Sequence, residues 1–136
     1  MSQRSLSGGR MHRVVHFDIM AGDPQRAIEF YSDVFGWTFE QWNGNEMEYW
    51  LVMTGDEDDP GIDGGLTRRR EDAPASSEAN AFVCAIETED VEATIDDVEA
   101  AGGVVTTEVM DIERAGRLAY CLDTEGNQFS LWEEVP

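Results

Sequence analysis

The residues best suited to acid–base chemistry lie near the start of the chain. Between Arg13 and Ile19 apolar and polar side chains alternate, which is typical of a half-buried strand and places His16 and Asp18 on one face. Histidine titrates near neutral pH, so His16 is a candidate acid, base or hydrogen-bond donor. Asp18 is a candidate to orient His16 or to bind a cationic ligand, but same-face positions on a strand lie about 6.5–7 Å apart, which leaves their hydrogen bond open. The alternatives are a hydrogen-bonded strand histidine without a reaction and a solvent-facing acid.

A second set of polar and aromatic side chains lies near the end of the chain. In an expected strand over residues 128–132, Ser130 and Trp132 share one face. Trp132 either stacks on a flat ligand or closes an interface. Ser130 and Tyr120 are candidates to form hydrogen bonds with a substrate, and Tyr120 also carries a phenolic proton, although the pattern does not fix its face.

Residue spacing does not predict a structural metal site or a disulfide framework. Cys84 and Cys121 lie inside apolar runs, outside any CxxC or Cys/His spacing, and alternation places Cys84 on the buried side of its strand. The acidic residues 56–59 are interpreted as a hydrated loop, because Pro60 stands where a calcium loop needs its third oxygen ligand. Residues 68–70 are three arginines, which either clamp a carboxylate or phosphate or form a solvated strand end paired with acids.

The charge balance excludes several classes of partner. The 136 residues include 29 acids against nine basic residues, all arginine, for a net charge of −20. Such a field repels nucleic acid, while a hydrophobic content of 41% is ample for a core. The excess of acid without lysine resembles the cytoplasmic proteins of salt-adapted prokaryotes. No apolar stretch is long enough for a membrane span or a signal peptide, so we expect a cytoplasmic protein without a membrane partner.

The elements that must position these residues follow one pattern twice. After the strand 13–19, Asp23 and Pro24 begin a helix that Gly36 ends. Strands are expected over 37–42 and 47–53, joined through Asn43-Gly44, and over 62–69.

The second copy comprises a strand over 81–86, a helix over 90–101 that ends at Gly102-Gly103, and strands over 104–109, 117–122 and 128–132. An offset of 67 residues matches Asp23 with Asp90 and Gly36 with Gly103, which indicates an internal duplication. We therefore predict an α+β fold of two tandem β-α-β-β-β modules in one domain over 1–136. The modules are 12–70 and 80–134, with a linker over 71–79 and a flexible segment over 1–11.

Specific motifs carry a resemblance to a known family. Residues 16–37 read His-Phe-Asp-Ile-x3-Asp-Pro-x2-Ala-Ile-x-Phe-Tyr-x3-Phe-Gly-Trp, and residues 123–132 read Asp-x2-Gly-Asn-x-Phe-Ser-Leu-Trp. With the duplication, they resemble the vicinal oxygen chelate superfamily, which holds glyoxalase I, bleomycin-resistance proteins and extradiol dioxygenases. Within it, residues 49–55 and 60–66 are similar to an uncharacterised glyoxalase-like subgroup related to lactoylglutathione lyase. The resemblance implies half-cup sheets, each with an open face that a homodimer would close.

The resemblance also implies four metal-ligand positions, one on the first and one on the last strand of each module. They fall on His16, Val83, Ser130 and a position near Gly65, which becomes Asp63 if the register of this glycine-rich strand differs by two residues. Valine cannot bind a metal and a neutral serine binds weakly, so we expect no tightly bound cofactor. The alternative is a nickel, zinc or manganese ion on His16 and Asp63.

Three functions therefore stay open. The first is a protein that binds a small organic molecule in a dimeric cup, acting as a lyase or isomerase with His16 as acid or base, Ser130 and Tyr120 as helpers, and Asp18, Trp132, Val83 and Gly65 lining the ligand. The second is a metal-dependent lactoylglutathione-lyase-like enzyme. The third is a drug-sequestering protein of the bleomycin-resistance type.

Overall fold

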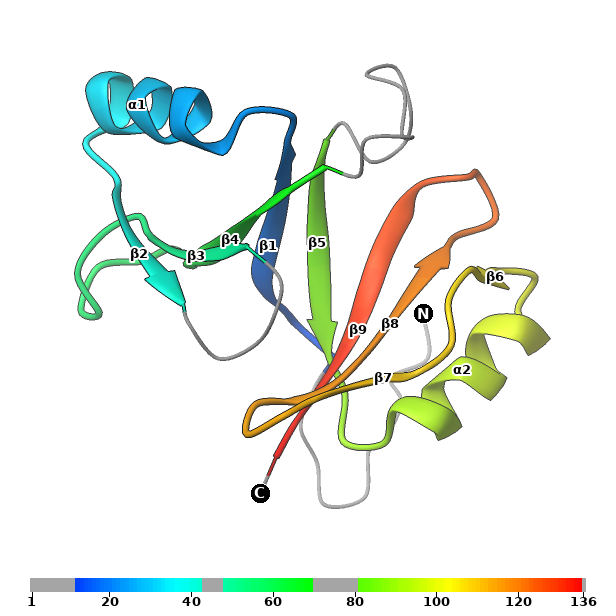
Figure 1. Ribbon diagram of the computed structural model, residues 1–136. Helices are drawn as coiled ribbons and strands as arrows, with labels where there is room; N and C mark the ends of the chain where they lie inside the picture. Colours follow the sequence, from blue (N-terminus) through cyan, green and yellow to red (C-terminus); the bar gives the residue numbers. More distant parts are fainter. Residues whose placement is uncertain (1–11, 43–47, 70–80, 136) are drawn as a thin grey trace. The chain divides into compact units, whose positions relative to one another are not determined.

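The computed structural model describes residues 12–42, 48–69 and 81–135 (Figure 1). The chain divides into two compact units, which we call the N-terminal unit (Val15–Ala85) and the C-terminal unit (Met1–Val14 with Ile86–Pro136). Several predicted features lie outside the described residues, namely the Asn43-Gly44 turn, Arg70, the linker 71–79 and the segment 1–11. Within the described ranges, no helix is long and apolar enough to cross a membrane.

The N-terminal unit has the predicted β-α-β-β-β order. Its elements are β1 (Val14–Ala21), α1 (Pro24–Phe35), β2 (Thr38–Trp42), β3 (Tyr49–Met53) and β4 (Gly64–Arg68). The strands lie in the order β2-β3-β4-β1, with β1 parallel to β4 and the other two pairs antiparallel. The parallel β1–β4 pair places the first and last strands of the module side by side.

Local sequence signals determine where α1 begins and ends. The Asp23 carboxylate accepts a hydrogen bond from the backbone N–H of Arg26 at 3.2 Å, and Pro24 occupies the first turn. Gly36 ends the helix with a φ of 75°, a left-handed conformation that glycine adopts without strain.

The two faces of the N-terminal sheet have different roles. One face packs against α1 and forms a core of Phe17, Ile19, Ala21, Trp50, Val52 and Leu66. The opposite face carries Asp18, Gly65 and Leu51. Gly65 of β4 pairs with Asp18 of β1 on one side and with Leu51 of β3 on the other. Alternation places His16 and Tyr49 on this second face as well, which we call the cup face.

The C-terminal unit repeats the order with one additional short strand. After β5 (Phe82–Glu87), which spans the boundary between the units, come α2 (Val91–Ala100), β6 (Val104–Val105), β7 (Met110–Ile112), β8 (Gly116–Leu122) and β9 (Gln128–Glu134). Strand β8 pairs antiparallel with β9, β6 and β7. The predicted single strand over 104–109 is wrong: it forms only the two residues of β6, and the sequence pattern did not reveal β7.

Packing in the C-terminal unit also uses one face of its strands. Val91, Ala119, Cys121 and Leu131 are buried there, with Ile95 and Val98 of α2 packed against them. Asp90 caps α2 as Asp23 caps α1, accepting a hydrogen bond from the N–H of Ala93 at 3.1 Å. The left-handed glycine after α2 is Gly102, with a φ of 99°.

Candidate functional site

His16, Asp18 and Tyr49 form a hydrogen-bonded group on the cup face of the N-terminal unit. The Nε2 atom of His16 lies 3.2 Å from Asp18 Oδ1 and 3.2 Å from Tyr49 Oη. The spacing of backbone positions left the first contact open, and the structure shows it because both side chains turn toward each other along β1. Asp18 is 8% exposed, so it is not the solvent-facing acid that the sequence allowed as an alternative.

The ring of His16 keeps one nitrogen available. Asp18 is an acceptor when ionised, which favours the tautomer that donates Nε2–H to its carboxylate. In that tautomer Nδ1 carries the lone pair, and no hydrogen bond to Nδ1 is found within the described part of the chain. The His16 side chain is 32% exposed, so a small molecule can reach the ring.

Tyr49 is the functional candidate that sequence reasoning missed. The run Tyr-Trp-Leu-Val-Met over β3 is apolar on both faces, so alternation did not show which side chains leave the core. Pairing resolves the faces, because Trp50 is buried beside α1 while Tyr49 lies on the cup face. A Cβ atom at Gly65 would overlap the Tyr49 hydroxyl, so glycine at this position leaves the room that the phenol occupies.

The side chains at the predicted metal-ligand positions do not form a ligand set. The Oδ1 atom of Asp63 accepts hydrogen bonds from the backbone N–H of Thr54 at 2.9 Å and from the Thr54 hydroxyl at 3.2 Å. Within residues 12–42, 48–69 and 81–135, no three histidine, cysteine or acidic side chains lie together in a way that could hold a metal ion. The residues present therefore do not fit the divalent metal ion that the resemblance implies. The reaction proposed below uses no metal ion.

Val83 and Cys121 are buried, whereas Cys84 is exposed. Val83 is 1% exposed and lies within the packed interior, without an open surface for a ligand. Cys84 is exposed, so the prediction that it is buried is wrong: on β5 it is Val83 and Ala85 that face the interior. Cys121 is buried, and this burial raises the pKa of its thiol, which makes it a poor nucleophile at neutral pH.

Ser130, Tyr120 and Trp132 share one face of the C-terminal strands. Ser130 pairs directly with Tyr120 across β8 and β9, which fixes the face of Tyr120 that the sequence left undetermined. Ser130 is fully buried, and its hydroxyl has no hydrogen-bond partner among the described residues. Gln128 lies two residues earlier on the same face. Its side-chain carbonyl oxygen is also buried and has no hydrogen-bond partner among the described residues. The structure thus places the predicted site residues in two groups, one in each unit.

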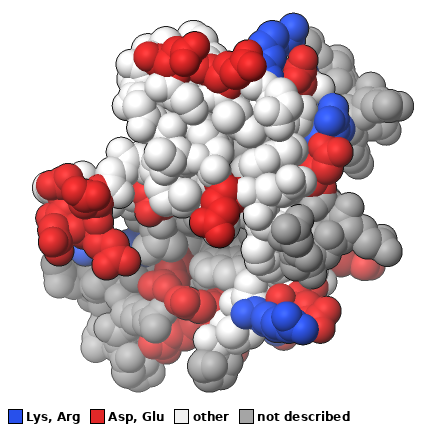
Figure 2. Space-filling view, turned by 60° about the vertical axis from the view of Figure 1, so that its left-hand side comes forward, with Lys and Arg blue, Asp and Glu red and all other residues white. Residues whose placement is uncertain are grey.

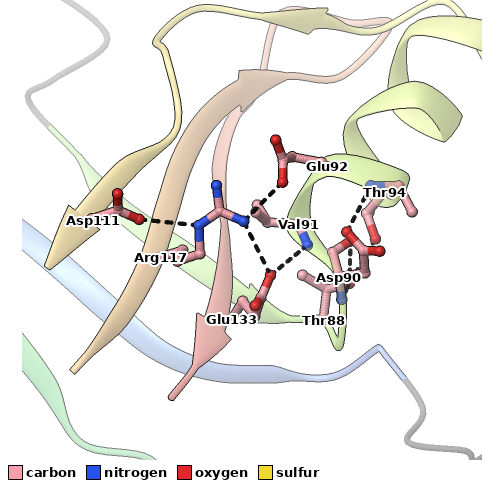
Figure 3. A network of polar contacts seen from close by, with 9 residues as sticks. Thr88, Asp90, Val91, Glu92, Thr94, Asp111, Arg117 and Glu133 are labelled. Atoms are coloured by element: carbon pink, nitrogen blue, oxygen red, sulfur yellow. Dashed lines mark hydrogen bonds and ion pairs between the residues drawn. The ribbon is translucent and has the colours of Figure 1, made fainter. Parts of the chain in front are cut away.

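Arg117 organises a separate polar network in the C-terminal unit (Figure 3). Its guanidinium lies 2.9 Å from Glu92 and 3.1 Å from Asp111, and these carboxylates raise the pKa of Arg117. Glu133 lies 4.0 Å from Arg117 and accepts a hydrogen bond from the N–H of Val91 at 2.9 Å. Since Val91 opens α2, the network ties the start of that helix to β7, β8 and β9, which is a structural role.

The remaining arginine cluster behaves as a strand end. Arg68 forms an ion pair with Glu48 at 2.9 Å, and both side chains are about half exposed. For Arg68, at the end of β4, this agrees with the interpretation of residues 68–70 as a solvated strand end paired with acids. Arg69 is only partly exposed and its Nε atom is buried.

Comparison with known families identifies this architecture. The family model described as the glyoxalase/bleomycin resistance protein/dioxygenase superfamily matches residues 13–131. The chain belongs to this superfamily. The predicted resemblance and fold class are therefore confirmed.

Relatives in the superfamily support the same conclusion. A probable lactoylglutathione lyase of Vibrio cholerae is 33% identical over 124 residues, which is 88% of this chain and 89% of that protein. A probable lactoylglutathione lyase of Vibrio parahaemolyticus is 30% identical over 122 residues, 88% of each protein.

Solved structures show the same fold at lower identity. A hypothetical protein of Bacillus halodurans matches with a TM-score of 0.69 at 14% identity, covering 93% of this chain and 97% of that one. A methylmalonyl-CoA epimerase of Mycobacterium tuberculosis matches with a TM-score of 0.65 at 18% identity, covering 90% and 88%.

Proposed function

We propose that this superfamily member transfers a proton at a carbon next to a carbonyl group in a small oxygenated metabolite, as a lyase or isomerase. The observation that carries the proposal is the contact of His16 with both Asp18 and Tyr49 on the cup face. A histidine held by a buried carboxylate and left with one free ring nitrogen is suited to general acid–base catalysis near neutral pH. Both Vibrio relatives are named probable lactoylglutathione lyases, and this name supports a small oxygenated substrate.

His16 and Asp18 have distinct roles in the proposed step. The Nδ1 atom of His16 accepts the proton as the C–H bond breaks, and the electron pair moves into the substrate carbonyl. Asp18 holds the ring and stabilises the imidazolium that forms. Returning the proton to another position or face completes the isomerisation without a co-reactant. Ser130 and Tyr120 as hydrogen-bonding helpers and Trp132 as a stacking surface remain predictions.

The test is proton exchange in heavy water. S-lactoylglutathione and a set of small 2-hydroxy ketones are incubated with the protein in D2O, and NMR follows deuterium entering next to the carbonyl. We expect exchange by the wild type after EDTA treatment, and a loss of about 100-fold or more in His16→Gln. His12→Gln is the matched control, because His12 is the other histidine and is exposed. Equal rates in His16→Gln and wild type would refute the proposal.

The second candidate is a metal-dependent lyase of the lactoylglutathione type. It is favoured by the 33% identity to the Vibrio cholerae protein over most of both chains. The same exchange assay separates the candidates, because activity that requires added nickel, zinc or manganese supports this one. The donor groups argue against it, because the Asp63 carboxylate already accepts two hydrogen bonds from Thr54 and no three possible metal ligands lie together among the described residues.

A further inference from the structure

The hydroxyl of Tyr49 is held on the cup face by its neighbours in the sheet. Tyr49 pairs with Thr67 of β4 on one side and with Trp42 of β2 on the other. The rings of Tyr49 and Trp42 meet edge to face, with their centroids 5.8 Å apart. Gly65 leaves the room that the hydroxyl occupies, and the hydroxyl lies 3.2 Å from His16 Nε2. These contacts fix the phenol beside the ring of His16.

Asp18 and Tyr49 approach the same nitrogen of His16. Nε2 lies 3.2 Å from Asp18 Oδ1 and 3.2 Å from Tyr49 Oη, and a ring nitrogen has either one hydrogen or one lone pair. A lone pair on Nε2 would face the ionised carboxylate of Asp18, so Nε2 carries the hydrogen. The phenol oxygen can then only accept from this N–H, and the phenolic hydrogen points away from Nε2.

The strands around Tyr49 offer no lysine or arginine that could stabilise an anion. Within the described strands β1 to β4 the single arginine is Arg68, which pairs with Ala21 and so belongs to the core side of the sheet. Strand pairing places the acids Asp18 and Glu40 on the cup face. In the view of Figure 2, acidic side chains likewise cover more of the described surface than arginines do. Negative charge that develops on a substrate oxygen at the cup face therefore needs a hydrogen-bond donor of another kind.

We propose that Tyr49 is a catalytic residue, which donates its phenolic hydrogen to the substrate carbonyl oxygen while His16 removes the proton from the neighbouring carbon. This inference rests on the proton transfer proposed above. The electron pair of the broken C–H bond forms a C=C bond, and the π electrons of the C=O bond move to the oxygen that Tyr49 contacts. The phenol keeps its covalent O–H bond, so the proton held by His16 Nδ1 is the one that returns to carbon.

The hydrogen bond from Tyr49 should act mainly in the transition state. The charge on the substrate oxygen is larger there than in the bound ketone, so the donor lowers the barrier more than it strengthens binding. Loss of one such donor lowers kcat by about 100- to 1000-fold in enzymes of known mechanism. We expect Tyr49→Phe to lower the maximal exchange rate about 100-fold, while KM changes less than about threefold.

Deuterium exchange into hydroxyacetone and S-lactoylglutathione in D2O, followed by NMR, tests the role of Tyr49. Initial rates are measured over a range of substrate concentrations for EDTA-treated wild type and variants. Tyr31→Phe is the matched control, because Tyr31 packs on the core side of α1 and its variant should keep the wild-type rate. Gly65→Ala displaces the hydroxyl of Tyr49 and should lower the maximal rate at least about 10-fold. Circular dichroism verifies that each variant is folded.

The outcomes separate this inference from the proposed function. If Tyr49→Phe exchanges as fast as an active wild type, the inference is overturned while the proposed function stands. A wild type that exchanges neither substrate overturns both.

A second measurement separates donation to the substrate from an effect through His16. NMR titration of the His16 ring gives the fraction of neutral imidazole in wild type and in Tyr49→Phe, and each exchange rate is divided by this fraction. The loss of about 100-fold should persist after this correction. If the corrected rates are equal, Tyr49 only positions His16 and the proposal is overturned.

Discussion

At the scale of single residues, the geometry of the cup face depends on the absence of a side chain at Gly65 as well as on the side chains that are present. Gly65 lacks the Cβ that would overlap the Tyr49 hydroxyl, and this hydroxyl lies 3.2 Å from His16. Asp18, directly paired with Gly65, lies within 3.2 Å of the same ring nitrogen. The resemblance implies a metal-ligand position near Gly65. In this protein the glycine at that position leaves room for the phenol ring of Tyr49. Tyr49, His16 and Asp18 act as one hydrogen-bonded unit.

Gly65→Ala should push the Tyr49 ring away from His16. We expect the free energy of unfolding to fall by about 1–2 kcal/mol, as in overpacked sites, and the His16 ring signals to shift in NMR spectra. Urea denaturation measures the loss. Gly55→Ala is the matched control, because nothing lies within 4 Å of a Cβ there, and it should change stability by less than about 0.5 kcal/mol. An unchanged His16 spectrum in Gly65→Ala would contradict the overlap.

Ser130→Ala should raise stability rather than lower it. The Ser130 hydroxyl is fully buried and unpartnered among the described residues, so the folded protein carries its desolvation cost without a hydrogen bond. Removing the oxygen is expected to increase the free energy of unfolding by about 1 kcal/mol, measured by chemical denaturation. A decrease of similar size would mean that the hydroxyl has a partner in solution.

At the scale of elements, the start of α2 depends on side chains from three strands. Glu133 of β9 accepts from the Val91 N–H, while Arg117 of β8 contacts Glu92 of α2 and Asp111 of β7 (Figure 3). In a chain with only nine basic residues, one arginine thus neutralises several acids around one helix terminus. Among the described residues, no comparable network surrounds the start of helix α1.

Arg117→Gln should loosen the start of α2. Without the guanidinium, Glu92, Glu133 and Asp111 lose their shared counter-charge, so the unfolding temperature should fall and the Val91 amide should exchange faster with solvent. Hydrogen exchange followed by NMR locates the effect. Arg13→Gln provides the control, because Arg13 is exposed and forms no side-chain ion pair in the described structure. Equal Val91 protection in both variants would show that the network does not hold the helix.

The turn between β8 and β9 should make stability depend on pH. The N–H of Asn127, its side-chain amide and the N–H of Glu125 donate to Asp123 and hold the pKa of that carboxyl below its usual value. A lowered folded-state pKa means that the stabilisation is present above about pH 4 and is lost as the pH falls through the folded-state pKa. Asp123→Asn should therefore be less stable than wild type at pH 7, and the difference should close as the pH falls through the lowered folded-state pKa of Asp123.

Unfolding curves across this pH range test the Asp123 prediction. Asp96→Asn, an exposed acid on α2, is the control and should show no such pH-dependent difference. A gap between Asp123→Asn and wild type that persists unchanged at low pH would rule out the charged carboxylate as the cause.

At the scale of the whole molecule, the net charge of −20 dominates. Repulsion among acids destabilises the compact state, and salt screens it within a Debye length of about 10 Å at 0.1 M and 3 Å at 1 M. We expect the unfolding temperature to rise by several degrees between low and molar NaCl, with most of the rise in the lower half of the range. Thermal scans at fixed protein concentration measure it. A flat or falling unfolding temperature would contradict this.

The sequence by itself determined the order of elements in the N-terminal unit and the ends of the helices. Asp23, Pro24 and Gly36 are local signals whose hydrogen bonds and backbone angles involve only neighbouring residues, so the pattern sufficed for α1. Asp90 did the same for α2. The alternation in β1 likewise placed His16 and Asp18 together on the face opposite the core. These features depend on interactions between residues that are close together in the sequence, so they can be predicted from it.

Only the tertiary structure decided which side chains meet. The His16–Tyr49 contact joins residues 33 positions apart through the pairing of β1, β4 and β3, and strand register cannot be read from an all-apolar run such as 49–53. The burial of Ser130, the exposure of Cys84 and the short β6 also depend on neighbouring strands rather than on local pattern. The physical reason is that a strand's face and length are fixed by its partners, whereas a helix carries its own hydrogen bonds.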